Sequence, residues 1–226
     1  MRYAIYYLPE ESSDLWRFGS GVLGYDSISA KPVDHLLLDL SEDLALLTPE
    51  PRIYGFHSTL KAPFSLARGA TEAMLIDAAT RLSLQLQAFT IGQLDVSILG
   101  SFIALTAQPN DALRDLAADC VKEFEPFRAT MTLAERTKRL RAPLTARQAE
   151  LMDAWGYPFV LDEFRFHMTL TSSLAPEKRA SVRDALAKSY LQIGAVARIT
   201  SFCLCVQRLG GAFRMLRRFA LGQPVS

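Results

Sequence analysis

The 226-residue chain is poor in the side chains that bind metals or form disulfides. It contains three cysteines and three histidines, with no Cys-x-x-Cys, His-x-x-x-His or His-x-x-Glu-His pattern. Zinc sites depend on such spacings, so we expect no metal and no cofactor. The cysteine count is odd, and Cys203 and Cys205 alternate with apolar residues as buried strand positions do. This argues against a disulfide framework and predicts a reducing compartment, the cytoplasm.

An excess of charge and a long apolar run are also missing. The formal net charge is +1 and the isoelectric point about 7.7. Proteins that grip many phosphates usually carry a basic excess, so a long nucleic acid is disfavoured as a partner, although a short oligonucleotide is not. No apolar run reaches membrane-spanning length, and Met1 leads into an expected strand without a signal peptide. We therefore expect no membrane partner, and the sequence does not indicate an oligomeric state.

Two of the three histidines occur in the same five-residue setting. The first copy is Phe56-His57-Ser58-Thr59-Leu60 and the second is Phe166-His167-Met168-Thr169-Leu170. Aromatic and β-branched enrichment predicts that both segments are strands, in which side chains alternate between two faces. His57 and Thr59 should then share one face, and His167 and Thr169 likewise. A single strand histidine is usually structural, but packing alone does not explain identical neighbours, so the repeat favours a catalytic role for both.

Basic side chains extend the two polar faces. By the same alternation Lys61 continues the face of His57 and Thr59, while Arg165 and Thr171 flank the second motif. Imidazoles beside hydroxyl and cationic groups suit a phosphoryl group. A basic residue at a strand end is, however, often only solvated.

The expected elements repeat along the chain. A motif strand, a helix and a hairpin occur in that order twice. Thr71, Asn110 and Thr145 are predicted helix caps, and Pro176 suits the first turn of a helix. We expect strands over 89–99, 102–107, 196–207 and 213–221, a helix over 13–19 and a loop over 19–31. This order predicts two pseudo-symmetric lobes, approximately 1–125 and 145–226. The connector 126–144 is rich in Arg and Lys, and is interpreted as a solvated linker or as a cationic flap in which Arg128 is the best candidate.

The two motifs resemble those of the two-histidine (2H) phosphoesterase superfamily. The sequence is also similar to a subgroup of proteobacterial proteins associated with phosphonate-utilisation operons, through Arg2–Tyr6, Leu15–Gly19, Tyr54–Phe64, Trp155–Pro158 and Glu163–Thr171. The resemblance implies an α+β fold in which 1–226 form a single duplicated, two-lobed domain. Antiparallel sheets would line a central cleft, with helices outside and one motif from each lobe.

The expected activity is metal-independent hydrolysis of a small cyclic phosphodiester, with a ribose cyclic phosphate suggested by the operon-type resemblance. One imidazole would act as base and the other as acid, while Thr59 and Thr169 bind the phosphoryl oxygens. Two alternatives remain at this point, which are processing of 2′,5′ or 2′,3′-cyclic RNA ends and a non-catalytic module that binds a phosphate ligand. The substrate-binding candidates are Lys61, Arg165, Arg128, Tyr54 and Tyr157.

Overall fold

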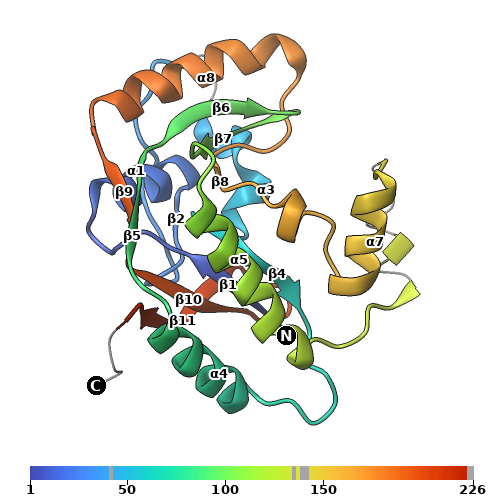
Figure 1. Cartoon of the computed structure of the whole chain (residues 1–226). Helices are drawn as coiled ribbons and strands as arrows, with labels where there is room; N and C mark the ends of the chain where they lie inside the picture. Colours follow the sequence, from blue (N-terminus) through green and yellow to red (C-terminus); the bar gives the residue numbers. More distant parts are fainter. Residues whose placement is uncertain (41–42, 134–135, 138–142, 223–226) are drawn as a thin grey trace.

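A computed structural model describes residues 1–40, 43–133, 136–137 and 143–222. The chain has an α+β fold with two principal antiparallel sheets and helices packed outside them (Figure 1). The first sheet has the order β11-β10-β1-β4 and the second β6-β7-β8. The bounds of the first are β1 Arg2–Tyr7, β4 Ser58–Phe64, β10 Ser201–Gln207 and β11 Phe213–Ala220, and those of the second are β6 Asp95–Leu99, β7 Phe102–Thr106 and β8 His167–Thr169. Each sheet therefore contains one histidine motif, at β4 and at β8.

The two sheets do not coincide with the two halves of the chain. The hairpin β6-β7 from the first half pairs with the second motif strand, whereas β10-β11 from the second half belongs to the sheet of the first motif. The strand pairing therefore does not follow the division into the predicted lobes 1–125 and 145–226. Instead, the two halves exchange their hairpins.

The exchange takes place where two predicted strands are divided. The strand expected over 89–99 is split into β5 (Phe89–Gln93) and β6, and the strand expected over 196–207 is split into β9 (Val196–Ile199) and β10. β5 and β9 pair with each other, and the chain then continues from each into a different sheet. Gly92, with φ +81°, lies at a register shift in this pair. A residue with a left-handed backbone conformation bends a strand at such a register shift, and glycine adopts this conformation without strain.

The long helices begin at the predicted caps. Side chains of the N-cap residues accept backbone N–H groups in α4 (Glu72–Gln85), α5 (Asp111–Glu123) and α7 (Ala146–Trp155), and Pro176 opens α8 (Pro176–Leu191). The shorter elements are α2 Leu44–Leu47, α3 Pro49–Arg52, the 3₁₀ helices η1 Glu125–Phe127 and η2 Leu161–Glu163, and the short strands β2 Tyr25–Asp26 and β3 Lys31–Pro32.

The first helix is longer than predicted. α1 spans Asp14–Leu23 and ends at Gly24, which is left-handed with φ +65°. The sequence predicts a helix that ends at Gly19, and glycine is a frequent helix terminator. Gly19 has a packing role instead, since a Cβ there would lie 2.1 Å from the ring of Phe56. The glycine lets the first motif approach α1.

Helices cover the outer faces of both sheets. α4 packs on β10 and β11, α5 on β4, and α8 on β6 and β7 (Figure 1). One apolar cluster extends through both sheets and includes Phe56, Leu60, Phe166, Met168 and Leu170. The alternation predicted for the motifs places these residues in the core. Over the described part of the chain, no helix is both long and apolar enough to cross a bilayer.

Only part of the basic connector is described. Residues 134–135 and 138–142, with Lys138, Arg139 and Arg141, lie outside the described residues, and so does that part of the flap hypothesis. Arg136 forms a two-point ion pair with Asp153 of α7, with N–O distances of 2.8 and 2.9 Å. This pair ties the connector to α7.

Candidate active site

The two histidine motifs line one cavity of about 640 Å³. His57 reaches it from just before β4, Thr59 from β4, and His167 and Thr169 from β8. Its other lining residues are Arg2, Tyr6, Tyr54, Ala62, Pro63, Phe64, Ser65 and Tyr157. The structure thus brings together the four residues that the repeat singled out, although they come from different sheets.

Both imidazoles are held in the same way. The Nδ1 atom of His57 lies 2.9 Å from the carbonyl oxygen of Gly55, and that of His167 lies 2.8 Å from the carbonyl oxygen of Arg165. A carbonyl oxygen can only accept a hydrogen bond, so Nδ1 carries a proton in each ring. In the neutral imidazole Nε2 is then the basic atom. The contact is made two residues back in both motifs, so the repeat extends from sequence to side-chain geometry.

The imidazole of His57 is enclosed by aromatic rings and a hydroxyl group. It stacks on Tyr6 with ring centres 3.8 Å apart, and Tyr54 lies 6.3 Å away. Its Nε2 is 3.1 Å from the hydroxyl of Thr59, which must be the donor if Nδ1 holds the proton. Burial lowers the pKa of His57 to about 4, the Gly55 carbonyl opposes this shift, and the charge of His167 adds to it. His57 is therefore neutral at pH 7.

Gly55 supplies the carbonyl that orients His57. Its φ is +73°, and a Cβ there would lie 2.6 Å from the Cβ of Ser27. Both the backbone conformation and the close contact require glycine. The Tyr-Gly-Phe-His segment therefore presents the imidazole by a local turn before β4 begins, rather than from within the strand as predicted.

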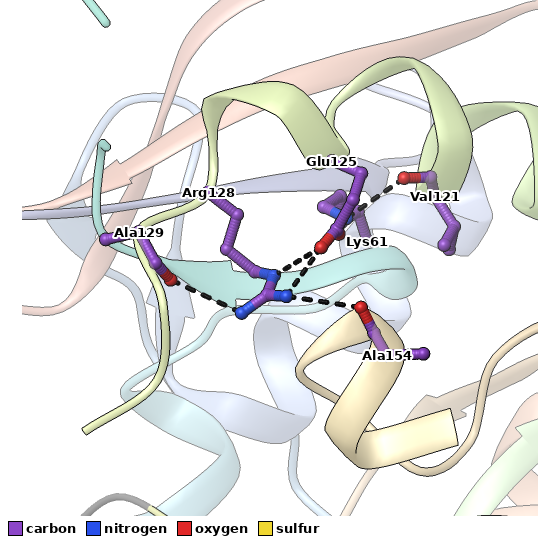
Figure 2. A network of polar contacts seen from close by, with 6 residues as sticks. All are labelled: Lys61, Val121, Glu125, Arg128, Ala129 and Ala154. Atoms are coloured by element: carbon purple, nitrogen blue, oxygen red, sulfur yellow. Dashed lines mark hydrogen bonds and ion pairs between the residues drawn. The ribbon is translucent and has the colours of Figure 1, made fainter. Parts of the chain in front are cut away.

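Lys61 lies outside the cavity, contrary to the prediction. Tyr6 pairs with Thr59 but Ile5 pairs with Lys61, so the ladder between β1 and β4 has an extra residue at Leu60. Such a β-bulge reverses the alternation, and the side chain of Lys61 points toward α5. It is only 3% exposed, and its Nζ donates to the carbonyl of Val121 at 3.0 Å and to Glu125 at 2.7 Å (Figure 2).

Arg128 is also placed away from the cavity lining. Its guanidinium pairs with the other oxygen of Glu125 and contacts the carbonyls of Ala129 and Ala154 (Figure 2). The group is 14% exposed and packs against Gly156, just before Tyr157. Glu125 is thus shared between a buried lysine and an arginine, which together hold its carboxyl pKa below the ordinary value although burial opposes this. The network joins β4, η1 and the end of α7.

The remaining candidates divide into two groups. Tyr54 and Tyr157 line the cavity as proposed from sequence. Arg165 is exposed and is not among the lining residues, and its link to the site is the carbonyl that accepts from His167. Among the described residues the lysine or arginine that lines the cavity is Arg2, whose Nε donates to Oε1 of Gln207 at 2.9 Å.

Sequence reasoning missed both Arg2 and Tyr6. They lie on β1 with the alternation Arg2, Ala4, Tyr6, and Tyr6 pairs with Thr59 of the first motif. The alternation was visible in the sequence, but the pairing of β1 with β4 was not. Burial raises the pKa of the Tyr6 hydroxyl well above its ordinary value, and that buried group has no hydrogen-bond partner among the described residues.

The donor set of the described residues does not resemble a metal centre. Within it, no three His, Cys, Asp or Glu side chains come close enough together to hold an ion. The chemistry available in the cavity is that of two imidazoles, two threonine hydroxyls, an arginine and tyrosine rings.

A family model described as "Protein of unknown function (DUF1045)" matches residues 59–214. The chain belongs to the DUF1045 family. The matched segment begins at Thr59 and contains the whole second motif. It includes the whole β6-β7-β8 sheet and the β5–β9 pair through which the hairpins are exchanged, whereas β1 and most of β11 of the first sheet lie outside it.

Two curated relatives share one name. The chain is 40% identical over 176 residues to "Ribose 1,5-bisphosphate phosphokinase PhnN" of Janthinobacterium sp. (strain Marseille), and 35% identical over 175 residues to the protein of that name from Laribacter hongkongensis (strain HLHK9). These matches cover 76% and 77% of this chain but 39% and 40% of the relatives. The chain thus spans about two fifths of the length of the relatives it matches.

A solved structure described as "Crystal structure of phosphoesterase" aligns over nearly the full length. It covers 98% of this chain and 99% of the other, with 15% sequence identity and a TM-score of 0.40.

Proposed function

We propose that this DUF1045 protein is a 2H-type phosphoesterase that hydrolyses a small cyclic phosphodiester without a metal ion. The observation that carries the proposal is the pair of identically anchored imidazoles in one cavity, each with a threonine two residues ahead. A packing role would not need both rings to hold Nδ1–H on a backbone carbonyl and line the same space. General acid–base chemistry needs that arrangement.

The two histidines take different roles. The lowered pKa of His57 supports its role as base, because a neutral Nε2 can remove a proton from water as the water oxygen attacks phosphorus. As the P–O bond to the sugar oxygen breaks, protonated His167 gives its Nε2 proton to that oxygen. The products are a phosphomonoester and a free hydroxyl, and the proton on His57 returns to solvent while His167 takes one up.

The negative charge on the phosphoryl group would be stabilised by side chains that line the cavity. Arg2 supplies one positive charge, which suits a single phosphoryl group, and Thr59 and Thr169 supply hydroxyl donors. In the free protein Thr59 donates to His57, so substrate binding must turn this hydroxyl toward a phosphoryl oxygen. The same movement frees the Nε2 lone pair of His57 for the attacking water.

The names of the relatives support a phosphorylated ribose as the substrate class. Both are named for a reaction of ribose 1,5-bisphosphate, and a ribose cyclic phosphate is also a phosphorylated ribose. Kinase activity is not part of the proposal, because the match covers only about two fifths of those proteins. The 226 residues also contain no G-x-x-x-x-G-K-[S/T] phosphate-binding loop.

A substrate comparison tests the proposal. Purified protein in EDTA is given a ribose cyclic phosphate, a nucleoside 2′,3′-cyclic phosphate and RNA oligonucleotides of increasing length, at 50 and 200 mM salt. We expect the ribose compound to have the highest kcat/KM, with a shallow salt dependence because few phosphates are neutralised. Rates that rise with RNA length and fall steeply with salt would favour RNA end-processing. Binding without turnover of any compound would favour the non-catalytic module.

A further inference from the structure

We infer that a second cavity, next to the first, is a subsite for the hydroxyl-bearing sugar part of the substrate. The inference rests on the proposed function. The second cavity measures about 330 Å³, and its walls include Tyr54, His57 and Thr169, which also line the first. The two spaces therefore meet at the motif residues, so a substrate with its phosphorus between the imidazoles can extend into both.

The second cavity is rich in hydroxyl groups that can still donate. The Thr171 hydroxyl accepts from the N–H of Ile103 at 3.0 Å, and the Ser172 hydroxyl accepts from the N–H of Glu50 at 3.1 Å. A hydroxyl that accepts keeps its own proton for another partner. Ser101 and Ser173 add two more hydroxyls to the lining. Such a wall suits a ligand with several oxygen atoms.

The charges of the two cavities differ in sign. No lysine or arginine lines the second cavity in the described structure, and its one carboxylate is that of Glu50. Arg2 lines only the first. A phosphate is therefore favoured beside Arg2 and disfavoured beside Glu50, whereas a sugar hydroxyl can donate to the Glu50 carboxylate at no cost in charge.

The apolar surfaces complete the match to a sugar. Tyr54 stands between the two cavities, and Phe102 contributes an aromatic ring beside His167, with ring centres 6.1 Å apart. Pockets that combine aromatic surface with a few oriented polar groups bind small molecules with defined orientation. The ligand class that fits is a neutral polyol or pentose joined to one phosphoryl group.

Two matched substrates test the subsite. One is a ribose cyclic phosphate, and the other is the cyclic phosphate of ethane-1,2-diol, which has no hydroxyl beyond those bound to phosphorus. The Glu50→Gln, Ser101→Ala double variant should lower the ratio of the two kcat/KM values by about tenfold or more, because each lost hydrogen bond to the sugar removes binding energy. The loss should lie mainly in KM. The control pairs Glu177→Gln with Ser181→Ala on α8, and should leave both substrates unaffected.

Binding of ribose cyclic phosphate, measured by calorimetry, tests the subsite separately from the proposed hydrolysis. Weaker binding by the double variant than by the wild type supports the subsite even if no turnover is seen, in which case the proposed hydrolysis alone fails. Equal binding, or an equal loss of kcat/KM on both substrates, overturns the subsite and leaves hydrolysis standing.

Discussion

At the scale of single residues, the protonation state and tautomer of His57 depend on the groups around its imidazole rather than on its place in a strand. Burial and the charge of His167 disfavour its charged form, the Gly55 carbonyl fixes its tautomer, and the Tyr6 ring stacks on the imidazole. The sequence predicted that His57, Thr59, His167 and Thr169 share the cavity, because the same repeat occurs in both motifs. It could not predict Tyr6 beneath His57, since that contact depends on which strand pairs with β4.

The first prediction concerns the pH dependence of kcat/KM. A base must be unprotonated, so activity is lost as pH falls through the pKa of His57 in the free protein, which is about 4. We expect kcat/KM to change little between pH 6.5 and 5, and to fall only near pH 4. Steady-state rates, with circular dichroism at each pH to verify folding, measure this. An acidic limb centred near pH 6.5 would assign the base to an ordinary, solvated histidine.

The second prediction concerns Gly55. In Gly55→Ala the added Cβ meets Ser27 and the residue is held at positive φ, so the variant should be destabilised by about 1–3 kcal/mol and His57 displaced. Gly69→Ala is the matched control, because Gly69 has φ +86° but no atom within 4 Å of the added Cβ. Urea unfolding and kcat for both variants make the comparison. Equal losses of kcat would mean that the turn does not position His57.

At the scale of elements, the sequence predicted helix starts better than sheet details. Thr71, Asn110 and Thr145 cap their helices because capping depends on a few adjacent residues. Local rules failed at the bulge in β4, where one extra residue moves Lys61 from the cavity to the α5 side. A bulge is set by the partner strand and the core, which the local pattern does not contain.

The third prediction separates the structural cation from the ligand-binding cation. Lys61→Met removes a buried charge paired with Glu125, so stability should fall by about 3 kcal/mol, while kcat/KM at a temperature where the variant is folded should change by less than about threefold. Arg2→Met should lower kcat/KM at least about tenfold, as expected for loss of a charge-assisted contact to a phosphoryl group. Lys122→Met, at the exposed end of α5, is the control. A large loss of kcat/KM in Lys61→Met without a loss of stability would indicate that Lys61 acts in the site after all.

At the scale of the whole molecule, the order of elements repeats along the chain, but each hairpin lies in the sheet that contains the motif of the opposite half. Each motif strand is joined in its sheet by the hairpin from the opposite half, and β5 pairs with β9 across the junction. The sequence showed the repeat of elements. The same order is compatible with hairpins that pair with the motif strand of their own half and with hairpins that pair with that of the opposite half. The choice depends on long-range strand pairing, which no local pattern reports.

The fourth prediction follows from this exchange. Fragments 1–125 and 145–226, expressed separately, should show no cooperative unfolding, because each lacks the hairpin that completes its sheet. Thermal unfolding followed by circular dichroism measures this, with the intact chain as the control. A cooperative transition in either fragment would show that one half folds without the exchanged hairpin.

The central claim is that His57 and His167 are a base and an acid acting on one phosphodiester. The most direct test is turnover of a ribose cyclic phosphate in EDTA by the wild type, His57→Ala and His167→Ala, each shown to be folded. We predict that each variant loses roughly 10²- to 10⁴-fold in kcat, the scale for losing one general acid or base, while the wild type is unaffected by the chelator. Wild-type rates in either variant, or activity that EDTA abolishes and zinc restores, would contradict the account.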